Sequence, residues 1–163
     1  MKSAFPPIVT PQSEILFLGT MPGEKSLELG QYYGNRSNQF WKLLFEVMGH
    51  PFLDDYNDRL GFIKENNFAL WDVLQLCERE GSLDSNIKSE VANDFETFFE
   101  SHPSLRAVFF TSKKAEWFYN RYAVKKEGIA YYVLPSPSGA YAFIPYAQKL
   151  DLWRKKILPL IRL

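Results

Sequence analysis

The sequence has few of the residues that build disulfides or metal sites. Its one cysteine, Cys77, can form neither an intrachain disulfide nor a four-cysteine iron–sulfur cluster within one chain. Its two histidines, His50 and His102, each stand beside a proline without a second His or Cys nearby, which argues against a zinc site. We therefore expect no metal and no cofactor, and the scarcity of cysteine favours an intracellular, cytoplasmic protein.

Long apolar runs and a charge of one sign are also lacking. No stretch is apolar over the length that a bilayer requires, and residues 1–14 are broken by prolines and lack the apolar centre of a signal peptide. The 19 basic and 19 acidic residues give a net charge of zero. That balance disfavours a protein that coats nucleic acid non-specifically, but it is compatible with an enzyme that grips a few phosphates through a local patch. No membrane association is expected.

The sequence does contain enough apolar material for a sizeable core. It is 46% hydrophobic and 17% aromatic, and its 163 residues have the size of one domain, 1–163. Hydrophobic periodicity predicts short strands at 14–18, 68–71, 106–111 and 129–134. It predicts helices from 38 to 48 and at 55–65, 88–100, 114–122 and 146–158, a helix or turn at 73–79 and a polar loop at 81–86.

Strands that alternate with helices are typical of an α/β fold. We expect a three-layer αβα sandwich around a central, mainly parallel four-stranded sheet. Ligands of such sheets bind just outside the carboxyl ends of the strands. Those ends carry the segments GTMPG (19–23), WD (71–72), TSKK (111–114) and PSPSGA (135–140).

The loop after the first strand superficially resembles a phosphate-binding loop. The required pattern is G-x-x-x-x-G-K-[ST], whereas from Gly19 to Ser26 the second glycine comes one residue early and Glu24 precedes the lysine. A tight turn at the end of a strand is therefore a better interpretation than a nucleoside triphosphate site.

Two adjacent tyrosines, Tyr32 and Tyr33, follow this loop. Neighbouring side chains of an extended segment point to opposite sides, so one ring can pack on the core while the other offers its face to a flat ligand. An aromatic side chain that stacks on a nucleobase contributes roughly 1–3 kcal/mol. In a chain with 14 Phe and 9 Tyr residues, both rings could instead be packing residues.

Asn38 opens the next helix, for which we expect Ser37 as the N-cap. The Asn38 amide is either a capping group or a group that orients a water and hydrogen-bonds a base. Because an amide cannot take up a proton as a base does, it would act by positioning and by stabilising charge. The turn after the last strand, residues 136–140, offers hydroxyl and N–H groups that could contact phosphates, or it is a Pro/Gly turn that caps a helix.

Taken together, these segments resemble the uracil-DNA glycosylase superfamily. GTMPG matches the first motif of that superfamily, and SPSGA matches its second, the loop that presses on DNA beside the lesion. The segments YYGNRSNQFW, ALWDVLQLCEREGSLDSNIK and LPSPSGAY are similar to its hypoxanthine-DNA glycosylase branch. The resemblance extends from Ile15 to about Trp153 and implies the sheet order of that superfamily.

The resemblance implies a division of labour among the residues. Met21 stands where the mismatch-specific uracil and thymine branch has a catalytic Asn, so the usual catalyst of the first motif is missing. Ser136 stands where relatives have His or Asn, which implies weaker or different stabilisation of the leaving group. In the hypoxanthine branch, catalysis depends on the Asn of the NxFW segment, which is Asn38 here. Tyr33 falls where relatives place the ring that stacks on the flipped base.

The same resemblance implies two further groups of residues. The first loop would bind the base, together with Tyr33, through Thr20, Met21, Pro22 and Gly23. The last loop would contact DNA through Ser136, Pro137, Ser138, Gly139, Ala140 and Tyr141. Relatives insert an apolar wedge at the position of Ala140, which is a small residue here, so we expect Tyr141 to fill the gap in the base stack.

The sequence thus predicts a monofunctional DNA glycosylase. It would flip a deaminated base out of DNA and hydrolyse its N-glycosidic bond, releasing hypoxanthine from deoxyinosine. The alternatives are a mismatch-type uracil/thymine-DNA glycosylase and a non-catalytic α/β nucleotide-binding module. Asp72 could serve as a base toward water, stabilise a cationic sugar or cap the following turn, and we favour the cap. The expected partner is DNA that contains deaminated bases, bound by a monomer acting on chromosomal DNA.

Overall fold

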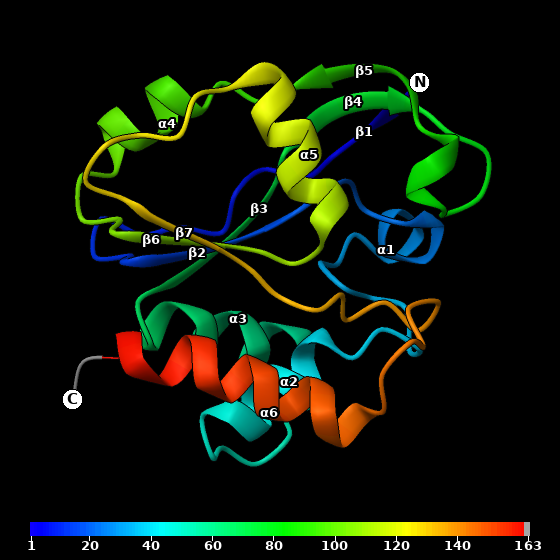
Figure 1. Ribbon diagram of the computed structural model, residues 1–163. Helices are drawn as coiled ribbons and strands as arrows, with labels where there is room; N and C mark the ends of the chain where they lie inside the picture. The colour runs from blue at the N-terminus through cyan, green and yellow to red at the C-terminus, as the bar shows by residue number, and fades with distance from the viewer. Residues whose placement is uncertain (162–163) are drawn as a thin grey trace.

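The centre of the molecule is a sheet of four parallel strands. The computed structural model describes residues 1–161. The strands are β2 (Ile15–Gly19), β3 (Phe68–Asp72), β6 (Ala107–Phe110) and β7 (Ala130–Val133), in the order β3-β2-β6-β7. All three pairings are parallel, as the sequence predicted. Their carboxyl ends therefore meet at one edge of the sheet (Figure 1).

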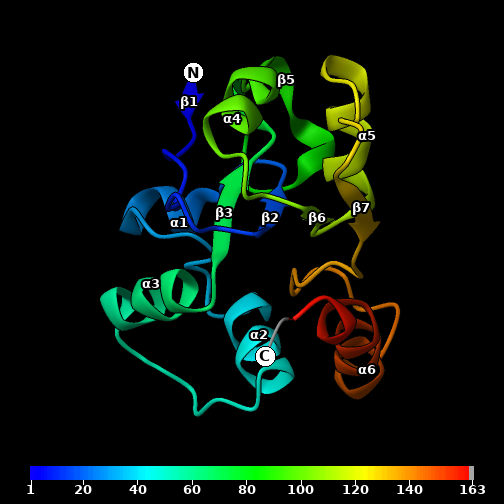
Figure 2. The ribbon, with the colours of Figure 1, turned by 90° about the vertical axis from the view of Figure 1, so that its left-hand side faces the viewer.

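Helices cover both faces of this sheet. All five residues of β2 are buried, because alternate side chains enter two separate apolar clusters. Phe17 packs into the cluster with α2 (Phe40–Val47), α3 (Tyr56–Glu65) and α6 (Tyr146–Ile157). Leu18 packs into the other cluster, with α4 (Phe95–Ser101) and α5 (Lys113–Tyr122). Figure 2 shows these layers on either side of the strands, which confirms the predicted αβα sandwich.

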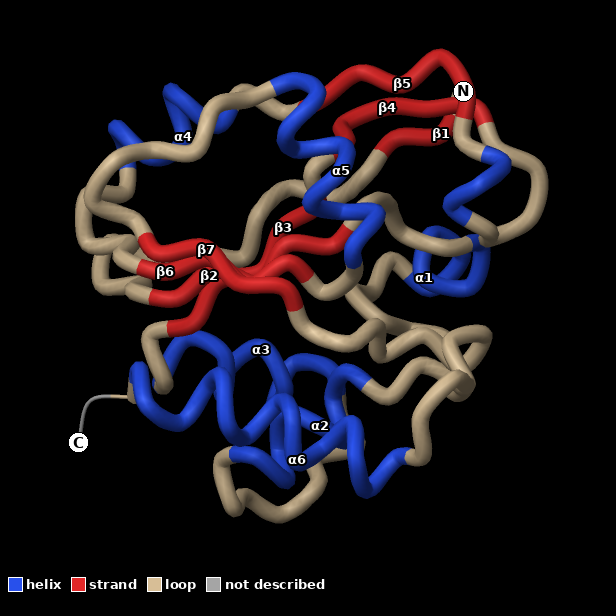
Figure 3. The backbone as a smooth tube through the Cα atoms, in the orientation of Figure 1, coloured by secondary structure: helices blue, strands red, loops and turns tan. Residues whose placement is uncertain are grey.

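A second, antiparallel sheet lies beside α4 and α5 and was not predicted. It consists of β1 (Lys2–Ser3), β4 (Leu74–Glu78) and β5 (Lys88–Ala92), in the order β1-β4-β5 (Figure 3). The expected helix or turn at 73–79 is thus mostly a strand. The expected helix at 88–100 is wrong over its first part, where β5 pairs with β4, and α4 begins only after Asp94, whose carboxylate caps it.

Short helical segments complete the chain. The helix α1 (Glu24–Leu29) was not predicted; it begins after Gly23 and ends at Gly30, whose φ of 66° is the left-handed conformation that glycine adopts easily. The expected polar loop at 81–86 contains a 3₁₀ turn, Asp84–Asn86, and a second one, Leu158–Leu160, follows α6. Within residues 1–161, no helix has the length and apolar character needed to span a membrane.

Candidate functional site

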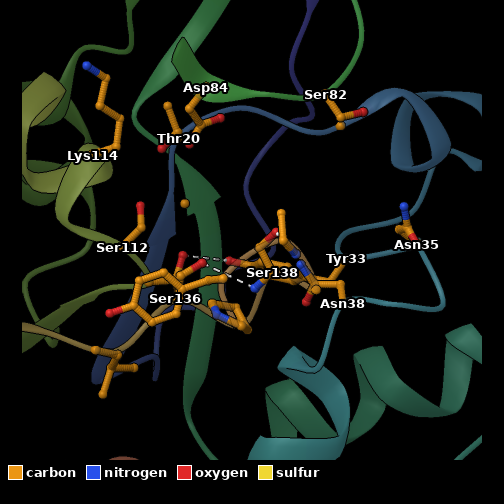
Figure 4. A pocket seen from close by; sticks show the side chains of 18 of the residues that line it. Thr20, Tyr33, Asn35, Asn38, Ser82, Asp84, Ser112, Lys114, Ser136 and Ser138 are labelled. Atoms are coloured by element: carbon orange, nitrogen blue, oxygen red, sulfur yellow. Dashed lines mark hydrogen bonds between the residues drawn. The ribbon is translucent and has the colours of Figure 1, made fainter. Parts of the chain in front are cut away.

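A cavity of about 740 Å³ opens at the carboxyl edge of the parallel sheet. Its walls come from the ends of all four parallel strands, from the segment between β2 and α2, and from loop 136–141 after β7 (Figure 4). Every residue for which the sequence predicted a site role lines it, namely Thr20, Met21, Pro22, Gly23, Tyr33, Asn38, Asp72, Ser136, Pro137, Ser138, Gly139, Ala140 and Tyr141. The structure therefore brings together segments that lie about a hundred residues apart in the sequence.

Both tyrosines line the cavity, but they differ in burial and in contacts. Tyr32 is 3% exposed, and its hydroxyl donates to the Pro6 carbonyl at 2.9 Å. Tyr33 has a φ of 54°, an uncommon conformation for a side chain of this size, and it stacks on Phe40 with ring centroids 3.9 Å apart. Burial raises the pKa of the Tyr33 hydroxyl, so this group stays neutral. The packing on Phe40 holds the Tyr33 ring rigidly in the cavity wall.

Asn38 is held by its own turn. Its side-chain carbonyl accepts the Phe40 N–H at 2.9 Å, and its backbone N–H donates to the Asn35 carbonyl at 2.9 Å. The Asn38 side-chain NH₂ group donates no hydrogen bond within residues 1–161. The capping and functional interpretations of Asn38 are therefore compatible, because one end of the amide caps α2 and the other is left for a ligand.

Ser37 is not the N-cap of α2, which corrects the sequence prediction. Gln39 occupies the cap position, and the first helical N–H is satisfied by Asn38. The Ser37 hydroxyl instead donates to the Asn35 side-chain carbonyl at 2.9 Å. This bond tightens the turn formed by residues 35–39, which we call the Asn38 turn.

Asp72 lies at the closed end of the cavity, under Gly19. It is 4% exposed, and its Oδ2 has no hydrogen-bond partner within residues 1–161. A Cβ at Gly19 would lie 2.7 Å from Asp72 Oδ1 and 3.2 Å from the Tyr33 hydroxyl, so glycine is required there. Burial, together with the charge of Asp84, raises the pKa of Asp72 to about 7, against a smaller opposing effect of Arg79. The favoured cap interpretation is wrong, because Asp72 is followed by the strand β4 and not by a helix.

An ion pair between Arg79 and Asp84 supports the first loop, residues 19–23, through the Pro22 carbonyl. The pair was not predicted from the sequence. The Arg79 side chain is fully buried, donates to the Pro22 carbonyl and lies 3.3 Å from Asp84 Oδ1. The Thr20 hydroxyl lies near the Asp84 carboxyl and favours its charged form, yet it completes no hydrogen bond of ordinary geometry. Figure 4 shows Thr20 and Asp84 together at one end of the cavity. This pair could not be found from the sequence, because Arg79 directly follows β4 and Asp84 begins a 3₁₀ turn, and neither element was predicted.

Loop 136–141 is ordered by its own serines and packs on the Asn38 turn. The Ser136 hydroxyl accepts the Ser138 N–H, and the Ser138 hydroxyl accepts the Ala140 N–H, both at 3.2 Å. A Cβ at Gly139 would lie 2.8 Å from the Cβ and carbonyl oxygen of Ser37. Only glycine therefore allows the two segments to approach this closely.

Each of the two histidines lies close to a backbone carbonyl. His50 Nδ1 lies 2.7 Å from the Pro51 carbonyl, and His102 Nδ1 lies 2.8 Å from the Phe98 carbonyl. Over the part of the chain that the structure describes, no group of three His, Cys, Asp or Glu side chains is arranged to hold a metal ion.

Comparisons with known proteins agree with this architecture. The family model of the uracil DNA glycosylase superfamily matches residues 6–159. A Methanosarcina acetivorans protein named hypoxanthine DNA glycosylase is 40% identical over 143 residues, which are 86% of this chain and 88% of the relative. A protein of the same name from Methanosarcina barkeri is 40% identical over 115 residues, 70% of this chain and 73% of the relative.

A solved structure shares the fold. The solution NMR structure of a Methanosarcina acetivorans protein, described as a candidate uracil DNA glycosylase, superposes with a TM-score of 0.77 at 36% identity. The match covers 94% of this chain and 97% of that one. The range matched by the family model contains every residue that lines the cavity.

Proposed function

The chain belongs to the uracil-DNA glycosylase superfamily, and from that premise we propose that it excises a deaminated base from DNA, releasing hypoxanthine from deoxyinosine. The observation that carries this proposal is the convergence of Tyr33, Asn38 and loop 136–141 on one cavity. The name shared by the two Methanosarcina relatives supports hypoxanthine as the base.

The base must leave the stack before the enzyme can act on it. Extrusion from a duplex costs a few kcal/mol and less at a mismatch, so deoxyinosine opposite thymine is favoured before any contact forms. Hydroxyl and N–H groups of loop 136–141 would hold the DNA backbone without reading its sequence. This assignment is supported by the position of the loop at the cavity rim and by its internal hydrogen bonds.

Inside the cavity, the flipped base would stack on Tyr33 with one edge toward the closed end. The Tyr33 hydroxyl and Asp72 converge at that end, which supports a contact of Asp72 with the base edge rather than with the water. Hypoxanthine presents an N–H donor beside a carbonyl acceptor on this edge. A protonated Asp72 carboxyl, which has one donor and one acceptor oxygen, matches that pair.

Charge develops on both sides of the bond that breaks. The base leaves with negative charge while the sugar acquires oxocarbenium character. Met21 and Gly23 line the cavity, and their backbone N–H groups donate no hydrogen bond within residues 1–161, which supports a role for them as donors to the departing base. One well-placed donor of this kind is worth roughly 3–4 kcal/mol. The free NH₂ group of Asn38 would hold the attacking water against the sugar carbon.

The side chain of Met21 argues against the alternative substrates, uracil and thymine. Its side chain is 7% exposed and packs in the apolar cluster with Leu18 and Trp71. A thioether can neither polarise water nor accept a proton, so uracil or thymine excision through first-motif chemistry has no catalytic group at this position. A pure nucleotide-binding module would use the same cavity without turnover.

A base-release assay tests the proposal. Purified protein is incubated with duplexes that contain inosine, uracil or xanthosine opposite each normal base, and with the single strands. We expect hypoxanthine to be released fastest. Release of uracil alone would favour the mismatch-type alternative, and no product at high protein concentration would leave only the binding module.

We further propose that the chain works as one monomeric domain on chromosomal DNA inside the cell. Tyr33, Asn38, Asp72 and loop 136–141 line one cavity of this chain, so the proposed reaction uses residues of one subunit.

A further inference from the structure

Lys149 is a buried cation without a carboxylate partner. It lies in α6, and only 2% of its surface is exposed. Its ammonium group forms no ion pair with any residue from 1 to 161. It donates instead to two neutral oxygens, Gln39 Oε1 at 2.8 Å and the Tyr141 carbonyl at 3.2 Å, and it lies 5.5 Å from the centroid of the Tyr141 ring.

These two acceptors belong to the two segments that form the cavity mouth. Gln39 directly follows Asn38, and its backbone N–H donates to the Pro137 carbonyl at 2.8 Å. Tyr141 ends loop 136–141, and its N–H donates to the Ser138 carbonyl at 3.0 Å. Lys149 therefore fastens the Asn38 turn to loop 136–141, beside the place where Gly139 meets Ser37.

Stability alone does not account for a charge in this position. An ammonium group loses its hydration on burial, and two neutral acceptors with one aromatic ring compensate only in part. A buried charge is weak evidence for a stabilising role, because the cost of its desolvation can exceed the electrostatic gain. A lysine at position 149 thus needs a benefit other than stability, and its two contacts point to geometry.

We propose that Lys149 is a positioning residue for hydrolysis of the glycosidic bond. It holds Asn38 and the DNA-contacting loop at a fixed separation, so that the water and the sugar are aligned when the base has flipped. This inference rests on the proposed glycosylase function. A displacement of about 1 Å in such a site can lower a rate by about 10²-fold, so a residue that touches no substrate can still control turnover.

The first test is Lys149→Met, which keeps the length of the side chain and removes its donors. We expect the single-turnover rate of hypoxanthine release to fall at least tenfold while the melting temperature stays equal or rises. The matched control is Lys155→Met on the same helix, an exposed lysine that pairs with Asp151. It should change neither quantity. An unchanged rate per mole of folded Lys149→Met protein overturns the proposal.

Epistasis shows whether Lys149 acts through Asn38. In an Asn38→Ala background, Lys149→Met should lower the residual rate less than threefold, because the group that it positions is gone. An equal loss in both backgrounds contradicts the inference. Gln39→Leu removes one acceptor without touching Lys149, and it should lower the rate in the same direction, which keeps the test valid if Lys149→Met does not fold.

Hydrogen exchange provides a readout that needs no activity. The Gln39 amide, bonded to the Pro137 carbonyl, should exchange faster in Lys149→Met than in the wild type, while amides of β2 stay unchanged. Unaltered Gln39 exchange overturns the Lys149 proposal even if the wild type is active. Absence of base release by the wild type overturns the proposed function, and faster Gln39 exchange would still support the fastening role.

Discussion

The Asn38 side-chain amide has two polar groups, a carbonyl oxygen and an NH₂ group, and they lie in different surroundings. Its oxygen accepts the Phe40 N–H, and its nitrogen faces the cavity without a partner within residues 1–161. Sequence analysis found the residue but could not choose between cap and catalyst, because both interpretations use the same position relative to the helix. The structure shows the hydrogen bond from the Phe40 N–H and leaves the two interpretations compatible, while the catalytic role of Asn38 stays a prediction.

Asn38→Ala should separate binding from turnover. Losing the cap costs about 1 kcal/mol of stability, and losing the group that holds the water should lower kcat by about 10²–10³-fold. Affinity for inosine-containing DNA, measured by fluorescence anisotropy, should change less than threefold. Unchanged kcat would show that another group positions the water.

We expect the titration of Asp72 to make kcat/KM depend on pH. The direction of the change shows whether Asp72 acts in its protonated or its ionised form. If its protonated carboxyl binds the base edge, kcat/KM should fall as pH rises through about 7, where the free enzyme loses this proton. Asp72→Asn retains a donor and an acceptor and should abolish that fall. A kcat/KM that rises through pH 7 would instead indicate an ionised carboxylate, as a water-activating base requires.

The Asp72 carboxyl should also make the free energy of unfolding depend on pH. Its folded-state pKa of about 7 lies above the unfolded value of about 3.9, so the folded state holds the proton more tightly. The resulting contribution to stability is complete below pH ~4 and is lost as pH rises through about 7. Urea unfolding of the wild type from pH 4 to 8 should show this loss, and Asp72→Asn should flatten the curve.

At the scale of elements, all four strands of the parallel sheet could be predicted from their apolar runs, and three of them are buried on both faces, whereas β7 is partly exposed. β2, β3 and β6 are continuous apolar runs, and their carboxyl ends indicated where the cavity lies. β4 and β5 could not be recognised, since β5 is mostly polar and pairs only with β4. α1 has six residues, too few to show a helical period. Lys149 was missed because its partners are distant in sequence.

The segment between β7 and α6 contains a second candidate for the wedge, besides Tyr141. The Tyr141 carbonyl is held by Lys149, and the Tyr141 ring lies over the same ammonium group. Phe143 is 84% exposed and meets the Tyr141 ring edge to face at 5.2 Å. Phe143 lies two residues after loop 136–141, which lines the cavity, and a large exposed apolar side chain in this segment is suited to enter the gap that a flipped base leaves.

Phe143→Ala should therefore slow hypoxanthine release from duplex DNA about tenfold and from single strands much less, because only the duplex must be opened. Phe52→Ala, which truncates another half-exposed phenylalanine, serves as the control and should affect neither substrate. Tyr141→Ala tested in parallel decides between the two rings. Equal losses on duplex and single strand would remove Phe143 as the wedge.

At the scale of the whole molecule, a neutral chain presents local positive charge at the cavity. Lys113 and Lys114, at the start of α5, line the cavity and form no ion pair within residues 1–161. Because net charge is zero, we expect a shallow dependence of log Kd on log salt concentration. The double variant Lys113→Ala, Lys114→Ala should lower that slope by about 2.

Lys64→Ala, on the exposed end of α3, is the matched control for this measurement and should leave the slope unchanged. A steep wild-type slope, or an equal effect of Lys64, would show that binding relies on a wider surface than the cavity rim.

The bond between Gln39 and Pro137, with Lys149 behind it, also orders events in time. During synthesis the chain acquires Asn38 early, whereas the loop that faces Asn38 emerges about a hundred residues later and the lysine that fastens it, Lys149, later still. A nascent chain that has already formed β2, β3 and β6 has the strand ends that line the cavity but lacks loop 136–141. Docking of α6 is thus the step that completes the cavity mouth. Cleavage of the chain ahead of α6 should abolish base release without unfolding the sheet.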